Sequence, residues 1–519
     1  MNKIINAIKQ HAKENANSTA YIVYDEISSN DFFCDSLSWH ELDCYSDCLA
    51  IYICNHTLTN SPVIVHGHKS KYMIVCFLAC VKSGHAYVPI DSSVPTSRVQ
   101  DIVDNVNPEI MLTTEETIVK VPSDCELLTK ERIIKTCENL TAETLSEENW
   151  LKPQDVFYII FTSGSTGKPK GVQITTECLV NYVEWAQNLG GGGYNQHPYR
   201  FLNQAPFSFD LSVMDVYISL YTGGTICAIT KNIQKNLRLL YKTLPETDVN
   251  VWVSTPSFAD VCLSDKSFNS NLLPHIKTFL FCGEILTNKT AEKLKDSFPD
   301  SIIVNTYGPT ESTVCVTEVV IDNNILSRYS PLPVGAARPG TWLFIIDEVG
   351  NHLPEGEQGE IIIVGDTVST GYFRNEEQTK KVFSTEIIEG KEHRLYHTGD
   401  KGYIKDGQLF YCGRIDFQIK LHGYRIEIED IENNLVKVEG VEKAVVIPNM
   451  EDNKVKSLTA YVVYRKERES DFKASQEIKS LLKAYVPEYM IPKKIIFVDS
   501  IPMTMNGKAD RRALEGNQR

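Results

Sequence analysis

The chain has 519 residues, a formal net charge of −15 at pH 7 and 42% hydrophobic residues. A chain of this length exceeds one ordinary core, so we expect two or more domains. The acidic balance argues against nucleic-acid partners, because a phosphate-binding surface needs clustered positive charge.

The fourteen cysteines are scattered and form no C-x-x-C pair, which favours reduced and mostly buried thiols. The amino-terminal segment lacks an apolar stretch of signal-peptide length. No run of about twenty apolar residues occurs, so membrane insertion is not expected. These features predict a cytoplasmic protein.

Short apolar runs alternate with segments of helical spacing through the first 330 residues. The clearest apolar runs are 62–67, 87–91, 156–164, 252–256, 278–284 and 301–308, and the clearest helical segments are 73–84 and 288–298. This alternation predicts an α/β fold with largely parallel sheets and packed helices. Ligands bind such sheets at the carboxyl ends of strands. Because polar or glycine-rich sequence ends three of these runs, we expect those ends to converge on one nucleotide cleft.

The pattern changes after about residue 330. Short β-like pieces at 341–347, 359–365 and 407–413 are separated by turn residues, which predicts a β-rich subdomain. The last hundred residues read as a small α+β unit. We therefore expect a large amino-terminal domain, 1–415, and a small carboxyl-terminal domain, 416–519. The glycines at 190–193 suggest a flexible surface loop.

The segment FTSGSTGKPKG, residues 161–171, has the composition of an anion-binding loop. Glycines allow close backbone approach to an oxyanion, and the hydroxyls of Thr162 and Ser163 can donate to phosphate oxygens. The spacing excludes a P-loop, which requires G-x-x-x-x-G-K-[ST]. Ser163 occupies the first glycine position of G-x-S-x-G, which excludes a serine nucleophile elbow. A flexible Ser/Gly turn is the alternative.

Four further motifs follow in chain order. NTYGPTE, 305–311, offers a tyrosine that can stack on a base and a carboxylate that can hold Mg²⁺. YHTGD, 396–400, offers an aspartate for ribose hydroxyls. The segment 411–427 mixes arginine, aspartate and lysine, and PMTMNGKADRR places Lys508 in a polar turn. Each motif alone could be an ordinary turn.

In this order and spacing the set resembles the adenylate-forming superfamily, specifically the adenylation domains of nonribosomal peptide synthesis. The resemblance covers nearly the whole chain. Segments 203–217, 253–263, 272–284 and 416–432 are most similar to the stand-alone ligases that activate D-alanine for teichoic acid esterification. The resemblance implies that ATP and Mg²⁺ activate D-alanine as its adenylate. The partner would be a separate carrier protein bearing a phosphopantetheine thiol.

The resemblance also implies roles for individual residues. Lys508 would be catalytic, bridging the substrate carboxylate and the α-phosphate, and would stabilise the transition state. Glu311 would bind Mg²⁺, Tyr307 would stack on adenine, and Asp416 would be the hinge about which the small domain rotates after adenylation. The nucleotide would be held by Thr162, Ser163, Asn305, Thr306, Tyr307, Gly308, Pro309, Thr310, Asp400, Tyr411, Cys412, Gly413, Arg414 and Lys508. After rotation, Lys508 would leave and the face near Gly423 would form a tunnel for the phosphopantetheine.

Three residues would hold the amino acid. Asp210 would bind the ammonium group, since a carboxylate among aromatic residues needs a cation or a shifted pKa. Its alternative role is a helix N-cap. Cys282 and Val314 would line the side-chain pocket, with plain core packing as the alternative. A thiol at Cys282 would narrow that pocket and favour the D enantiomer.

Two other functions remain open from the sequence. The enzyme could adenylate another small amino acid, or a fatty or aryl acid destined for coenzyme A. Alternatively, the chain could be a catalytically silent module that binds ATP or a carrier. Asp210 argues against an acid without an amino group, and the joint presence of Glu311, Asp400 and Lys508 argues against a silent module.

Overall fold

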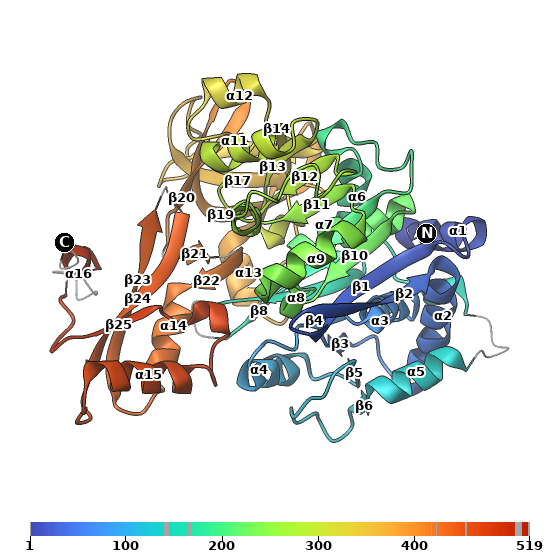
Figure 1. The fold of residues 1–519 in the computed structure, drawn as a ribbon, viewed down its shortest axis with the longest axis horizontal. Helices are drawn as coiled ribbons and strands as arrows, with labels where there is room; N and C mark the ends of the chain where they lie inside the picture. Colours follow the sequence, from blue (N-terminus) through green and yellow to red (C-terminus); the bar gives the residue numbers. More distant parts are fainter. Residues whose placement is uncertain are drawn as a thin grey trace.

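The computed structural model describes residues 2–139, 145–164, 168–416, 418–421, 423–451, 454–503 and 511–516. Two sheets dominate the first two thirds of the chain (Figure 1). The larger has nine strands in the order β15–β14–β13–β12–β11–β9–β10–β1–β2. The six central strands, β13 to β1, are parallel, and antiparallel pairs lie at both edges. In sheet order its strands are Ala336–Ala337, Thr317–Val320, Ile302–Tyr307, Thr278–Phe281, Val251–Ser254, Arg200–Asn203, Thr225–Ile229, Thr19–Ser28 and Asp31–Ser38.

The second sheet has six strands in the order β6–β5–β3–β4–β7–β8. All its pairs are parallel except β7 with β8. In that order the strands are Glu126–Leu128, Ile110–Thr113, Val63–His66, Tyr87–Ile90, Val156–Thr162 and Lys170–Thr175. The six apolar runs noted in the sequence are all strands, which confirms the predicted parallel α/β architecture.

Helices fill the space between the two sheets and cover their outer faces. One continuous core joins both sheets through α1 (Lys3–Glu14), α2 (Trp39–His56), α3 (Lys71–Lys82), α5 (Lys130–Glu138), α6 (Thr176–Ala186) and α7 (Leu211–Thr222). Helices α8 (Lys231–Lys235), α9 (Leu237–Thr247), α10 (Pro256–Cys262), α11 (Asn288–Ser297) and α12 (Asn323–Arg328) pack on the other face of the nine-stranded sheet. Helix α4 (Thr96–Val106) covers the other face of the six-stranded sheet.

Successive side chains of a strand point to opposite faces, so the strands divide their residues between these cores. In β11, Trp252 faces the outer helices while Val251 and Val253 face the shared core. Both faces of the central strands are therefore apolar, as expected for parallel strands covered on both sides.

A third sheet confirms the predicted β-rich subdomain. It runs β16–β17–β19–β18, with β20 paired to β19, and contains no parallel pair among its described strands. In chain order its elements are β16 (Thr341–Ile346), β17 (Gly359–Gly365), α13 (Glu376–Val382), β18 (Phe383–Ile388), β19 (Lys391–Lys405) and β20 (Gln408–Arg414). Its core includes Tyr307 at the end of β13, which joins this sheet to the nine-stranded one.

The carboxyl-terminal part is a small α+β domain with its own core. It comprises the hairpin β21 (Gln418–Leu421) and β22 (Tyr424–Glu427), the sheet β23 (Val441–Glu451), β24 (Lys454–Tyr464) and β25 (Lys494–Phe497), and helices α14 (Ile428–Leu435), α15 (Asp471–Leu482) and α16 (Arg511–Gly516). Short 3₁₀ turns lie at Glu147–Asn149, Leu189–Gly191, Thr310–Ser312 and Glu488–Met490. The β23–β25 sheet lies to one side of the molecule, and the hairpin points toward the large domain (Figure 1).

In the glycine segment 190–193, Gly191 is exposed, as expected for a surface loop, but Gly190 is packed. Gly190 lies in the 3₁₀ turn, and its backbone N–H donates to Glu318 Oε2 at 2.9 Å. A Cβ at Gly190 would lie 2.6 Å from Val304 in β13, so this glycine is packed against the sheet. Four adjacent glycines indicate backbone freedom, but the neighbouring strand fixes the conformation.

All fourteen cysteines are free and most are buried, as expected for reduced thiols. Among the helices of the described residues, none is long and apolar enough to cross a membrane.

Candidate active site

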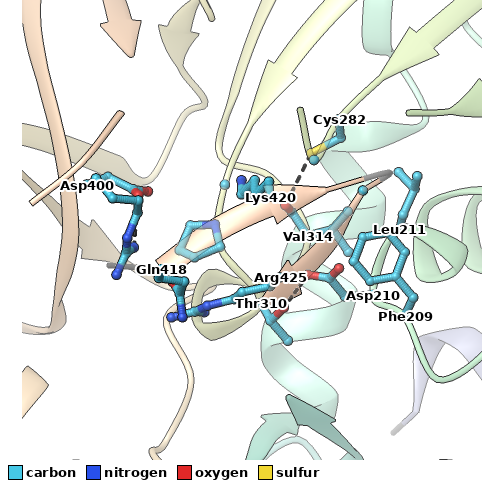
Figure 2. A pocket seen from close by; sticks show the side chains of 15 residues that line it. Phe209, Asp210, Leu211, Cys282, Thr310, Val314, Asp400, Gln418, Lys420 and Arg425 are labelled. Carbon is cyan, nitrogen blue, oxygen red and sulfur yellow. Dashed lines mark hydrogen bonds and ion pairs between the residues drawn. The ribbon is translucent and has the colours of Figure 1, made fainter. Parts of the chain in front are cut away.

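Loops at the carboxyl ends of several strands meet the β21–β22 hairpin at one cavity (Figure 2). The lining residues are Phe209, Asp210, Leu211, Cys282, Gly283, Gly308, Pro309, Thr310, Val314, Asp400, Arg414, Gln418, Lys420, Gly423 and Arg425. The loops after β12 and β13 contribute directly. The loop after β7 reaches the same place because Ser163 is hydrogen-bonded to Arg425. Two of the three predicted strand ends therefore line one cavity, and the third contacts a hairpin residue that lines it.

Asp210 lies at the first turn of α7, almost fully buried, with its carboxylate facing the cavity (Figure 2). It occupies the N-cap position but caps no helix N–H. Instead, its Oδ2 accepts a hydrogen bond from Thr310 Oγ1 at 2.7 Å. No ion pair to Asp210 is present among the described residues, and burial raises the pKa of its carboxyl group. The site therefore suits a small cationic group that would restore the charged form.

Cys282 and Val314 line the same cavity. Both side chains are buried, and the Cys282 thiol donates to the backbone oxygen of Val314 at 3.7 Å. Thr313 and Val314 have φ values of 59° and 67°, which are strained for β-branched residues. Strain of this kind persists only where the surrounding structure enforces it, and it is common beside ligands. This strained turn directs the Val314 side chain into the cavity (Figure 2).

The segment 305–310 divides into two parts. Asn305 and Thr306 use their side chains to bind backbone oxygens, those of Pro333 and Phe281, and neither lines the cavity. Gly308, Pro309 and Thr310 do line it. The sequence placed all of these residues at the nucleotide, whereas in this structure the Asn305 side chain binds the loop before β15 and the Thr306 side chain binds β12.

Tyr307 packs in the core of the third sheet and donates its hydroxyl to Asp400 Oδ2 at 2.6 Å. Burial raises the pKa of Tyr307 far above its usual value. Its ring centroid is 5.9 Å from that of Tyr411. The two rings and Asp400 thus form one aromatic and acidic wall beside the cavity.

Asp400 and Asp416 share one arginine. Arg414 Nη1 lies 2.9 Å from Asp400 Oδ1, and its Nε and Nη2 bind both oxygens of Asp416. Burial opposes charge on Arg414, but the two carboxylates raise its pKa. Gly413 has a φ of 104°, a conformation favourable only for glycine, and Cys412 is exposed and away from the cavity. Asp416, the predicted hinge residue, is therefore ion-paired to Arg414, a predicted ribose-binding residue.

Glu311 is completely buried and has several partners. Arg425 Nη1 lies 2.6 Å from its Oε2, the Tyr372 hydroxyl donates to Oε1 at 2.8 Å, and Lys170 Nζ is 4.0 Å away. Burial would raise the pKa of Glu311, but the two cations outweigh it and lower the pKa to about 2. Burial also lowers the pKa of Lys170 to about 8.

Ser163 also contacts the hairpin. Its hydroxyl donates to the backbone oxygen of Arg425 at 2.8 Å and accepts from the N–H of Glu427 at 3.2 Å. Within the described part of the chain, the Thr162 hydroxyl makes one long contact, 3.5 Å, to the backbone oxygen of Lys170. Lys508 lies outside the described residues.

Sequence reasoning missed two cationic residues of the hairpin, Lys420 and Arg425, and the contacts of Glu284 and Tyr372. Gly423 N–H donates to Glu284 Oε1 at 2.8 Å, and a Cβ at Gly423 would lie 2.3 Å from Thr255. The mixture of charges in 411–427 was a signal for the first two. The described residues contain no group of three or more His, Cys, Asp or Glu side chains suited to hold a metal ion alone.

The sequence matches two families along its length. Residues 8–373 match the family described as AMP-binding enzyme, and residues 430–508 match the AMP-binding enzyme C-terminal domain.

Curated relatives and solved structures agree with this assignment. A D-alanine–D-alanyl carrier protein ligase of Listeria monocytogenes serotype 4a is 47% identical, covering 92% of this chain and 93% of the relative. The ligase of the same name from Bacillus anthracis strain CDC 684 is 44% identical over 99% of both chains. A Vibrio cholerae adenylation domain, solved with glycyl-adenosine-5′-phosphate, superposes with a TM-score of 0.78 at 20% identity, covering 100% of this chain and 97% of the other.

Proposed function

Because the chain belongs to the AMP-binding enzyme family, we propose that it is an ATP-dependent ligase that activates D-alanine and loads it onto a carrier protein. In the first step, the D-alanine carboxylate attacks the α-phosphate of ATP, and pyrophosphate leaves. In the second step, the carrier's phosphopantetheine thiol attacks the acyl carbon of D-alanyl-AMP, and AMP leaves. The enzyme would act in the cytoplasm, and its product would serve D-alanylation of teichoic acid. The names of relatives that cover nearly the whole chain support this substrate and partner.

The observation that carries the proposal is the buried carboxylate of Asp210. It lies at one end of the cavity, bound to Thr310 and without an ion-pair partner among the described residues. A D-alanine ammonium group would complete this site and would favour ionised Asp210. An acid lacking an amino group would leave the carboxylate buried and unpaired, which disfavours fatty or aryl substrates.

We assign the side-chain wall to Cys282 and Val314. The methyl group of D-alanine would point to one side of the cavity, whereas the methyl group of L-alanine would point to the other side. The strained turn at Thr313 and Val314 holds this wall rigid, so a steric preference of about 1–3 kcal/mol is reasonable.

The nucleotide would extend from this pocket toward Asp400. Asp400 and Arg414 would hold the ribose, Tyr307 and Tyr411 would form the wall beside adenine, and the backbone of 308–310 would contact the nucleotide. Thr162 and Ser163 would bind phosphate oxygens. Asn305 and Thr306 would act indirectly, by fixing the strand that presents this segment.

Glu311 fits the Mg²⁺ that the family implies. Its carboxylate is a hard oxygen donor, is buried and lies beside Arg425. Mg²⁺ is commonly bound by one or two carboxylates together with phosphates and water. When bound, the ion would neutralise charge on the phosphates. Tyr372 would orient the carboxylate through its 2.8 Å hydrogen bond.

Lys508 would supply the cation for the first step, and the small domain would then rotate about Asp416, at the boundary between 1–415 and 416–519. The docked hairpin supports this proposal. Gly423 contacts Thr255 and Glu284, so the hairpin occupies the large-domain site from the side we assign to the carrier's phosphopantetheine. This arrangement agrees with the second, transfer step.

The test is amino-acid-dependent exchange of pyrophosphate into ATP, measured with D-alanine, L-alanine, glycine and D-serine. We expect strong exchange with D-alanine and weak exchange with the others. Exchange with a different amino acid would retain the adenylation and overturn the substrate. Absence of exchange with every amino acid would contradict the proposed reaction.

A further inference from the structure

Arg425 makes two contacts to the large domain that have different chemistry. Its guanidinium binds the Glu311 carboxylate at 2.6 Å, while its backbone oxygen accepts from the Ser163 hydroxyl at 2.8 Å. One residue of the small domain therefore occupies both a proposed metal ligand and a proposed phosphate ligand. Figure 2 shows the Arg425 side chain extending from the hairpin beside Thr310.

Glu311 cannot remain charged in this corner without a strong cation. It is completely buried, and leaving one partner of a buried ion pair unpaired is strongly destabilising. Lys170 is the second cation, but its ammonium nitrogen is 4.0 Å from the carboxylate, whereas the nearest guanidinium nitrogen of Arg425 is 2.6 Å away. The main neutralising contact therefore comes from the other domain.

The docked hairpin also occupies the hydroxyl group that we assign to phosphate binding. Ser163 has one hydroxyl proton, and in this structure it is donated to Arg425 rather than outward. On the other side of Arg425 lies a polar cavity of about 380 Å³, whose walls include Lys170, Tyr372 and Arg414. A metal-bound pyrophosphate at Glu311 and Ser163 and the docked hairpin therefore require the same atoms.

We propose that Arg425 takes the place of the metal ion at Glu311, so that the hairpin docks only after metal-bound pyrophosphate has left. Arg425 is then a positioning residue for carrier loading. The replacement of Mg²⁺ by the Arg425 guanidinium at Glu311 would set the order of adenylation and carrier loading. This inference rests on the proposed function, because it needs a phosphate and metal site at Ser163 and Glu311.

The test is hydrogen exchange of the hairpin amides, followed by mass spectrometry of peptides that cover 418–427. Two of these amides bond to the large domain, Gly423 N–H to Glu284 and Glu427 N–H to Ser163. The protein is compared without ligand, with Mg²⁺ alone, with pyrophosphate and a chelator, and with Mg²⁺ and pyrophosphate together. We expect faster exchange only in the last sample, by about tenfold, the scale of one hydrogen bond to a charged group.

Two variants separate the role of Arg425 from general domain contact. In Arg425→Met, the hairpin amides should exchange fast in all four samples. In Arg425→Lys, part of their protection from exchange should return. Arg98→Met is the matched control, because Arg98 binds Asp430 of the small domain at 2.8 Å without contacting Ser163 or Glu311. This control should still respond to Mg²⁺ with pyrophosphate.

Activity gives a second readout. Arg425→Met should lower the rate of carrier loading at least tenfold, the same scale as above, while changing pyrophosphate exchange much less. A purely structural role would lower both rates together.

The outcomes distinguish the inference from the proposed function. Calorimetry first establishes whether pyrophosphate binds in the presence of Mg²⁺. If it binds and hairpin exchange does not change, or if pyrophosphate with chelator has the same effect, the inference is wrong and the proposed function stands. If pyrophosphate does not bind, both fail.

Discussion

Two buried carboxylates, Asp210 and Glu311, differ in their environments. Among the described residues, the Thr310 hydroxyl is the one side-chain hydrogen-bond partner of Asp210, and burial raises the pKa of this carboxyl group. Glu311 is buried even more completely, yet Arg425 and Lys170 lower its pKa to about 2. The large domain supplies both carboxylates, but among the described residues only Glu311 is ion-paired to a residue of the small domain.

The difference indicates what each site binds. A carboxylate without a protein cation favours a cationic ligand, which is the substrate ammonium group in our proposal. A carboxylate that is neutralised by a movable domain can exchange that cation for another. The five predictions below, made with four variants, test this distinction, beginning with the largest expected effect.

Lys508→Ala tests whether the small domain brings a second cation to the cleft. We expect D-alanine-dependent pyrophosphate exchange to fall by about 10²–10³-fold, the effect of removing one transition-state donor. Binding of ATP, measured by calorimetry, should persist. Lys473→Ala, on the exposed face of α15, is the control and should behave as wild type. Unchanged exchange in Lys508→Ala would remove this lysine from the mechanism.

Asp210→Asn tests the unpaired carboxylate. The KM for D-alanine should rise by about 10- to 100-fold, the scale of a hydrogen bond between charged groups, with little change in the KM for ATP. Equal changes in both would favour a structural role.

The same variant makes a prediction for stability. An acid whose pKa is raised by burial destabilises the folded state above that raised pKa, and the penalty disappears as pH falls through it. Asp210→Asn should therefore melt at a higher temperature than wild type at neutral pH, and the difference should shrink in acid. A lower melting temperature at neutral pH would contradict the assignment.

Cys282→Ala tests the wall beside Asp210. Removing the thiol should widen the pocket and lower the preference for D-alanine over L-alanine by about tenfold, within the 1–3 kcal/mol of a steric contact. Pyrophosphate exchange with both enantiomers measures this ratio. An unchanged ratio would make Cys282 simple packing.

Tyr372→Phe tests the paired carboxylate and should have the smallest effect. Loss of the hydrogen bond to Glu311 removes about 1 kcal/mol, so the Mg²⁺ concentration for half-maximal exchange should rise about fivefold. The KM for D-alanine should not change, because Tyr372 does not line that cavity. A change in D-alanine KM alone would mean that the two sides of the cleft are not independent.

The sequence predicted the residues of the proposed amino-acid pocket better than the contacts around the proposed phosphate site. Asp210, Cys282 and Val314 lie together because each lies in a loop after a strand of one sheet. The carboxyl ends of parallel strands meet at one edge, and the sequence indicates where each strand ends. Arg425 was missed because its partner is 114 residues away and belongs to another domain, a distance that leaves no periodic signal. The packing of Gly190 was missed for a similar reason, since only the neighbouring β13 reveals it.

The core of the small domain has a consequence for unfolding. Ile419, Leu421 and Ile426 of the hairpin pack with Ile478 and Leu482 of α15, in a core separate from those of the large domain. The hairpin is therefore part of a cooperative unit that can leave the cleft without losing its own fold. Heating should melt this unit and the large domain in separate calorimetric transitions, and a ligand that releases the hairpin should move those transitions further apart.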